Sequence, residues 1–179
     1  MTSTGPAPRL LKFPFEMTPL TFHVGDLLGR PGQHRQVVGT LPLQLKVGES
    51  SVDGEALVTA RLEGVSDGIL VTVQAETVAH HQCARCLTEW SDVISIEAVE
   101  LFTRRSAGDQ PAIAADLTID LSQIVHDEIS LNLPPDPLCL PDCAGLCAIC
   151  GADLNMAPCA GHGDDLASPF AALKQLFET

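Results

Sequence analysis

Seven cysteines and a neighbouring histidine are the residues of this 179-residue chain whose types and spacing suit metal chemistry. They are Cys83, Cys86, Cys139, Cys143, Cys147, Cys150, Cys159 and His162. Cys83 with Cys86, and Cys147 with Cys150, form two Cys-x-x-Cys pairs. This spacing lets both sulfurs of a pair reach one ion, and structural zinc takes four such ligands in a tetrahedron. The pattern predicts one closed, structural Zn2+ site.

Three choices of the four ligands remain open on spacing alone. A compact site would be formed by Cys139, Cys143, Cys147 and Cys150. A site that joins distant parts of the chain would be formed by Cys83, Cys86, Cys147 and Cys150. A third site would be formed by Cys147, Cys150, Cys159 and His162. The sequence does not decide among them.

Catalysis is not expected. A thiol redox protein is the alternative, because redox dithiols share the Cys-x-x-Cys spacing. However, such a dithiol opens a helix after a strand in a βαβ unit, and neither pair here has that context. The chain lacks the GxSxG, P-loop, GxGxxG and HExxH motifs. We therefore expect no small-molecule substrate, and we expect the adjacent His80 and His81 to be surface residues.

The apolar runs and the N-terminal residues of the sequence indicate the cellular compartment of the protein. No run approaches 18 apolar residues, so no transmembrane helix and no membrane partner are expected. The N-terminal residues MTSTGPAPRLLKFPFEM do not resemble a secretory signal. We therefore expect a cytoplasmic protein, in a reducing compartment where disulfides are rare.

Charge is unevenly distributed. The chain carries 23 acidic and 10 basic residues, a net charge of −13, and residues 106–179 hold only one of the basic ones, Lys174. Because nucleic-acid binding depends on neutralising phosphates, this acidic part suits a basic protein partner, or serves solubility alone. The candidate RNA contacts lie elsewhere and are Arg30, Arg35, Arg85, Arg104 and Arg105.

Apolar residues alternate with polar ones along much of the first half of the chain, which is typical of half-buried strands. The clearest runs cover residues 41–47, 56–62, 69–78 and 93–102. Asp53-Gly54 and Asp67-Gly68 are typical hairpin turns. We predict an antiparallel β meander, or partly open barrel, over residues 37–102.

Helical spacing replaces this alternation further along. Leu121, Ile124, Val125 and Ile129 fit one stripe of a central helix over 119–129 that Asp120 would cap. Ser168-Pro169 would begin a C-terminal helix. The predicted α+β fold has a flexible tail (1–19), a core of antiparallel sheet plus helix (20–138), and a cysteine-rich zinc segment with a C-terminal helix (139–179).

Several of these motifs together resemble the YceD family of large ribosomal RNA subunit accumulation proteins. They are Cys83-Ala84-Arg85-Cys86-Leu87, Asp120-Leu121, Leu131-Asn132-Leu133-Pro134 and the run from Cys139 to Asn155. The resemblance covers the chain from about residue 20 to its end. One departure is Gly161, where relatives often have a cysteine; His162 follows it.

The resemblance implies a bacterial cytoplasmic factor for 23S ribosomal RNA accumulation and large-subunit assembly. Two modes of action are compatible with the sequence. The protein binds ribosomal RNA directly through its arginines, or it acts as an acidic chaperone that holds a basic large-subunit ribosomal protein.

Overall fold

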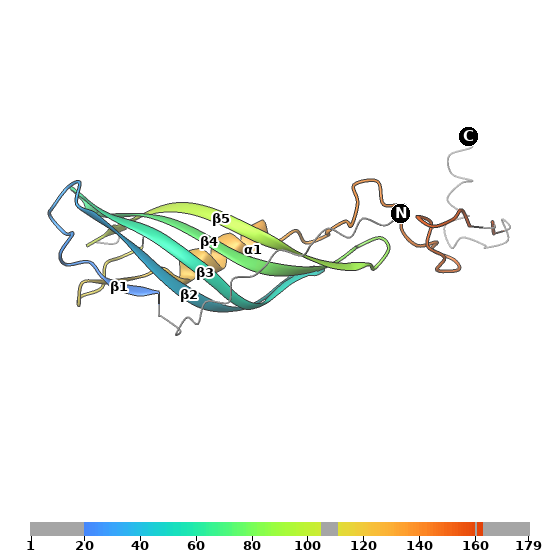
Figure 1. Ribbon diagram of the computed structural model, residues 1–179, viewed down its shortest axis with the longest axis horizontal. Coiled ribbons are helices and arrows are strands. Elements are labelled where there is room, and N and C mark those ends of the chain that lie inside the picture. Colours follow the sequence, from blue (N-terminus) through green and yellow to red (C-terminus); the bar gives the residue numbers. More distant parts are fainter. Residues whose placement is uncertain (1–19, 105–110, 160, 163–179) are drawn as a thin grey trace, which may run out of the picture.

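The computed structural model describes residues 20–104, 111–159 and 161–162. Its elements are β1 (Thr21–His23), β2 (His34–Val47), β3 (Ser50–Val65), β4 (Gly68–Gln82), β5 (Glu89–Thr103), β6 (Thr118–Asp120) and α1 (Ser122–Asn132). Figure 1 shows an elongated molecule in which long strands lead to a cysteine-rich segment at one end. The expected tail over 1–19 and the expected C-terminal helix lie outside the described residues.

Four long strands form one antiparallel sheet in the order β2-β3-β4-β5, and β1 pairs with β6 in a second, two-stranded sheet. The strands form because their sequence alternates: along β4 the odd-numbered residues from Ile69 to His81 are buried and most even-numbered ones are not. Because the edges β2 and β5 do not pair, the sheet is open, which agrees with the predicted meander.

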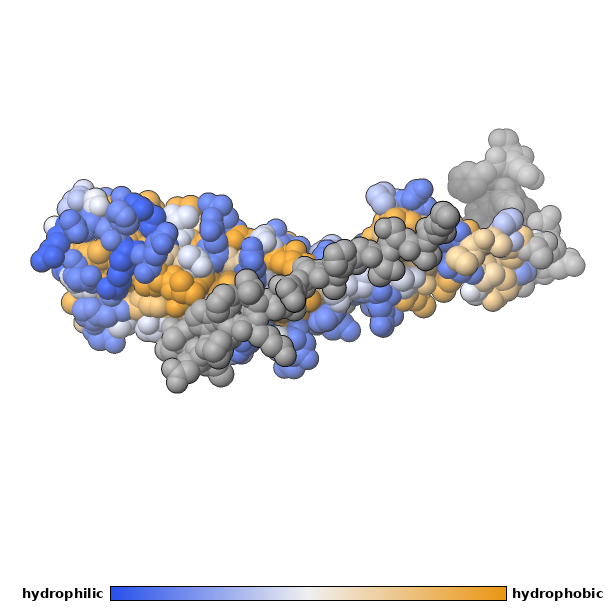
Figure 2. Space-filling view, in the orientation of Figure 1, coloured by the Kyte–Doolittle hydropathy of each residue, from blue (hydrophilic) through white to orange (hydrophobic). Residues whose placement is uncertain are grey.

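The buried face of the sheet packs on α1, which contacts both edge strands, β5 and β2. The sheet therefore curves around the helix. Val125 and Ile129 are the fully buried residues of α1. They join strand residues such as Val58, Leu62 and Val71 in one hydrophobic core. Figure 2 shows polar residues gathered at the end that carries the β3–β4 turn, and apolar residues along the sheet.

The helix begins later than the sequence suggested. Ile119 and Asp120 belong to β6, and α1 starts at Ser122. Leu121 occupies the N-cap position without a side-chain cap. The Asp120 carboxylate instead accepts a hydrogen bond from the Ser122 N–H at 2.8 Å. No helix within the described ranges is long and apolar enough to cross a membrane.

One of the two predicted hairpin turns is wrong. Asp67 lies in the turn between β3 and β4, as expected. Gly54, however, lies inside β3 opposite Leu43, next to a register shift between β3 and β4. A glycine within a strand commonly marks such an irregularity, so the Asp-Gly pair does not identify the turn here. The β2–β3 turn lies at Gly48 and Glu49.

Gly48 lets this turn approach the segment that follows α1. Its φ is +55°, and a Cβ at this position would lie 2.0 Å from the Pro135 carbonyl oxygen. That carbonyl accepts a hydrogen bond from the Glu49 N–H at 3.0 Å. Glycine is therefore required both for the left-handed backbone and for the contact.

We predict that Gly48→Ala lowers the free energy of unfolding by about 1–3 kcal/mol, the usual cost of a strained left-handed residue. Gly54→Ala is the matched control, since a Cβ there meets nothing within 4 Å. The control should change stability by less than about 1 kcal/mol. Chemical denaturation of both variants measures the difference, and equal losses would contradict the assigned turn.

Candidate metal centres

Four cysteines from two distant segments meet at the end of the sheet formed by the β4–β5 turn. Cys83 and Cys86 lie in that turn, and Cys139 and Cys143 lie in the segment that follows α1. We call these four residues the inner sulfur group. Cys83, Cys86 and Cys143 are buried, with Trp90, Leu138 and Leu146 packed against them.

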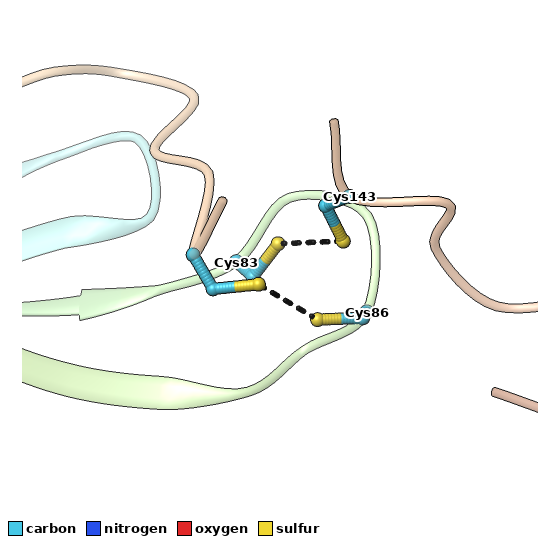
Figure 3. Close-up of side chains that lie close together, drawn as sticks. Cys83, Cys86 and Cys143 are labelled. Carbon is cyan, nitrogen blue, oxygen red and sulfur yellow. Dashed lines mark hydrogen bonds between the residues drawn. The ribbon is translucent and has the colours of Figure 1, made fainter. Parts of the chain in front are cut away.

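The inner sulfur group has the dimensions of a tetrahedral zinc site. Its Sγ atoms all lie within 4.8 Å of one another. The Cys83–Cys143 distance is 3.8 Å and the Cys86–Cys139 distance is 3.5 Å. Figure 3 shows Cys83, Cys86 and Cys143 directing their sulfurs into the same space. A tetrahedron with metal–sulfur bonds of about 2.3 Å has edges of about 3.8 Å, whereas a disulfide requires about 2.05 Å.

The backbone of the β4–β5 turn positions its two cysteines. The Cys83 N–H donates to the Thr88 carbonyl and the Leu87 N–H donates to the Cys83 carbonyl, both at 2.9 Å. Leu87 completes the turn in the left-handed region, with φ of 62°. The Arg85 N–H lies 3.5 Å from the Cys83 sulfur, the contact expected when backbone amides surround a bound thiolate.

Further hydrogen bonds join this turn to the later segment. The Ala84 N–H donates to the Pro137 carbonyl at 2.9 Å, and the Leu146 N–H donates to the Arg85 carbonyl at 3.0 Å. The Arg85 guanidinium donates to the Cys143 carbonyl at 2.9 Å. Gly145, at φ of 78°, allows close approach, since a Cβ there would lie 3.1 Å from the Arg85 carbonyl oxygen.

The electrostatics of the inner sulfur group favour a cation. Burial raises the pKa of the Cys83 thiol, but hydrogen bonds from the backbone of Cys139, Cys86 and Arg85 outweigh it and lower the pKa to about 6. The Cys86 sulfur raises the pKa of Cys139 to about 12, with burial as a further cause. Four thiolates this close repel one another, so a divalent cation is needed to hold all of them deprotonated.

A second group lies further along the chain. Cys147, Cys150, Cys159 and His162 place their ligand atoms within 4.8 Å of one another. We call these four residues the outer sulfur group. Cys150 and His162 are exposed, while Cys147 and Cys159 are half-buried. Three sulfurs and one imidazole are a second ligand set used by structural zinc.

The imidazole completes the outer sulfur group. His162 Nε2 lies 3.2 Å from the Cys147 sulfur and 2.9 Å from that of Cys159, and the Cys150 and Cys159 sulfurs are 3.7 Å apart. Backbone hydrogen bonds from Cys150 and Ile149 lower the pKa of the Cys147 thiol to about 6. Gly151 and Gly161 follow their cysteines with φ of 70° and 92°, which turns the chain back toward the group.

The structure distributes the predicted ligands over two groups, where the sequence predicted one ion. It gathers Cys147, Cys150, Cys159 and His162, one of the three sets left open. It does not gather the compact set, because Cys139 and Cys143 turn toward Cys83 and Cys86. The structure also does not bring together Cys83, Cys86, Cys147 and Cys150, the set that would join the two Cys-x-x-Cys pairs. Spacing reveals which cysteines form a local pair but not which pairs meet in the fold.

Among the described residues, the candidate RNA-binding Arg85 lies apart from Arg30, Arg35 and Arg104. Arg35 pairs with Asp26 at 3.2 Å and donates to the His23 carbonyl. Arg85 lies at the β4–β5 turn, bonded to Cys143. Arg30 and Arg104 are exposed toward the opposite end of the sheet, where Arg104 lines a hollow beside the β3–β4 turn. Arg105 lies outside the described residues.

His81 differs from its predicted surface position. Its side chain is 3% exposed and packs on Trp90, with ring centroids 5.2 Å apart. Its Nδ1 lies 2.8 Å from the Ser50 hydroxyl oxygen, and its Nε2 lies 3.0 Å from Asp92 Oδ1. The strand alternation already indicates the inward position, since His81 has the parity of the buried residues of β4.

Ser50, His81 and Asp92 have the residue types of a hydrolase triad, but their geometry is structural. Ser50 is 1% exposed and its hydroxyl donates to the Pro134 carbonyl at 2.5 Å. Its only proton is therefore directed at the backbone and not at His81 Nδ1. The three residues connect β3, β4 and β5 to the chain after α1, beside the inner sulfur group.

Comparison with known proteins identifies relatives along most of the chain. Residues 71–177 match the family described as large ribosomal RNA subunit accumulation protein YceD. An uncharacterized protein of Mycobacterium tuberculosis (strain ATCC 25618 / H37Rv) is 34% identical over 165 residues, covering 85% of this chain and 78% of that protein. An uncharacterized protein of Mycobacterium leprae (strain TN) is 33% identical over 169 residues, covering 87% and 76%.

A shorter similarity involves a chloroplast protein of Zea mays named large ribosomal RNA subunit accumulation protein YCED homolog 1. It is 50% identical over 42 residues, which cover 24% of this chain and 14% of that protein. No solved structure matches the chain. The family match extends over more than half of the sequence and includes both sulfur groups. The chain therefore belongs to the YceD family.

Proposed function

We propose that this protein is a non-catalytic cytoplasmic binding factor in large-subunit biogenesis that supports the accumulation of 23S ribosomal RNA. Membership of a family named for accumulation of that RNA carries the proposal. The name of the maize relative uses the same words. The ligand sets support a role without catalysis, because catalytic zinc has three protein ligands and an open position, whereas each group here has four.

Zn2+ is the metal we propose for both groups. Four sulfurs, or three sulfurs and an imidazole, in tetrahedral spacing are typical of zinc rather than of cations that prefer oxygen. In the inner sulfur group the ion would join the β4–β5 turn to the segment after α1. In the outer sulfur group it would fold only residues 147–162. The two ions should therefore contribute differently to stability.

We expect the purified chain to bind about two zinc ions, one for each set of four ligands. Cys83→Ser should reduce this to about one and lower the free energy of unfolding by about 4 kcal/mol or more, as loss of a structural metal does. Cys150→Ser, the exposed counterpart, should also remove about one ion but leave the unfolding of the sheet unchanged. Elemental analysis and denaturation measure both quantities.

Two results would contradict this assignment. One is a single ion in the unaltered chain that either substitution removes, because the eight ligands would then serve one site. The other is full zinc content in both variants. The thiol redox alternative would require turnover of a dithiol in the metal-free protein, and it fails if the metal-free chain reduces no disulfide substrate.

The charges of the described residues favour a basic ribosomal protein as the direct partner over RNA. These residues include eighteen carboxylates against six lysines and arginines. Among the described candidate arginines, Arg35 pairs with Asp26 and Arg85 donates to the Cys143 carbonyl. Arg30 lies beside Gly64, near the β3–β4 turn, whereas Arg85 lies in the β4–β5 turn. Phosphate binding needs clustered cations. Arg85 lies apart from Arg30, Arg35 and Arg104, and carboxylates outnumber basic side chains three to one among the described residues.

We predict that the immobilised full chain retains basic large-subunit proteins at low salt and does not retain purified large-subunit ribosomal RNA. Retention should weaken as salt rises, because charge attraction between exposed groups is screened. RNA binding with a steep negative slope of log affinity against log salt would contradict this partner and support direct RNA binding.

A further inference from the structure

The sheet has a second face, opposite α1, that we call the outer face. It consists of the even-numbered residues of β2 and β4 and the odd-numbered residues of β3 and β5, which the strand register places side by side. Most of these residues are exposed or half-buried, in contrast to the buried residues of the other face. Within the described part of the chain, the outer face is thus exposed along four long strands.

Carboxylates dominate this face, although it belongs to the half of the chain with most of the basic residues. Its acidic residues are Asp53, Glu55, Glu63, Glu76, Glu89 and Glu97, and its basic residues are Lys46 and Arg61. Arg61 already pairs with Glu63 at 2.9 Å. A phosphate backbone would be repelled here, and a basic chain would be attracted.

A hollow on the outer face brings two of these carboxylates together. It has a volume of about 350 Å³ and lies between β4 and β5, lined by Glu76 and Glu97 with Gln74 and Ser95. In the strand register Glu76 lies opposite Ser95, and Glu97 lies opposite Gln74. The two acids are therefore diagonal neighbours on adjacent strands. The Ser95 hydroxyl donates to Glu76 at 3.4 Å. Among the residues that the structure describes, no basic side chain lines this hollow.

Aliphatic side chains lie among the acids. Val38, Leu57, Val93 and Val99 are 44–57% exposed, and all four have outer-face positions. Leu57 is paired directly with Glu76, at the centre of the sheet. A partner that covers this face therefore needs both apolar and positively charged side chains, a combination that polypeptides have and nucleic acids lack.

We propose that the outer face binds a basic, aliphatic-containing polypeptide segment and that Glu76 and Glu97 hold one of its lysine or arginine side chains. This deepens and rests on the proposed function, since the segment would belong to a basic protein of the large subunit. It assigns the contact to the sheet, and not to the acidic C-terminal part that the sequence suggested.

A labelled synthetic peptide of alternating lysine and valine residues tests the surface directly. Titrated with the full zinc-loaded chain at low salt, it should bind, and the double variant Glu76→Gln with Glu97→Gln should weaken binding about tenfold, or roughly 1.4 kcal/mol. The matched control is Glu100→Gln with Glu128→Gln, which removes the same charge away from the outer face. The control should change affinity less than about twofold.

Equal weakening by both double variants would overturn the proposal, because net charge alone would then explain binding. Preferential binding of single-stranded RNA over the peptide would also overturn it.

A cell assay separates this inference from the proposed function. Deletion of the gene should lower the ratio of large- to small-subunit ribosomal RNA, and the unaltered chain should restore it. At equal protein level, the Glu76→Gln, Glu97→Gln variant should fail to restore the ratio and the control variant should succeed. A deletion that leaves the ratio unchanged would overturn the proposed function. Full restoration by the outer-face variant would overturn this inference alone.

Discussion

The contact between four sulfur atoms at the end of the sheet is the constraint on which the rest of the structure depends. Cys83 and Cys86 belong to a strand turn, while Cys139 and Cys143 arrive more than fifty residues later, after the helix. Hydrogen bonds from Ala84, Arg85 and Leu146 align the two segments. The repulsion among close thiolates opposes this arrangement until a cation compensates it. Binding of a metal by this group would therefore be coupled to the docking of the later segment.

Because the sulfur groups lie at one end of the sheet, the outer face of the sheet can serve as a binding surface. The helix and the core residues cover one face, and the inner sulfur group lies at the β4–β5 turn, so neither covers the outer face. The Ser50–His81–Asp92 contacts reinforce the same end by joining three strands to the chain after α1. The acidic surface is thus carried by four hydrogen-bonded strands, and a preorganised surface would lose less entropy when a partner binds.

The sequence predicts the strands well because alternation is a local property that each strand expresses by itself. It misplaces one turn because Asp53-Gly54 has the composition of a hairpin, while the register shift beside Gly54 depends on the neighbouring strand. The sequence contains every residue of both groups but does not assign them, since Cys86 and Cys139 lie more than fifty residues apart and meet only in the folded chain. The sequence does not reveal the acidic outer face for a similar reason. Its carboxylates are separated by other residues along the chain and become neighbours only across strands.

The most direct test is zinc X-ray absorption spectroscopy on two single-site variants. In Cys150→Ser the remaining ion should be bound by four sulfurs at about 2.3 Å, the all-sulfur shell of the inner group. In Cys86→Ser the remaining ion should have three sulfurs and one nitrogen at about 2.0–2.1 Å. The same mixed shell in both variants, or sulfur–sulfur distances near 2.05 Å in place of zinc ligation, would contradict two separate metal centres.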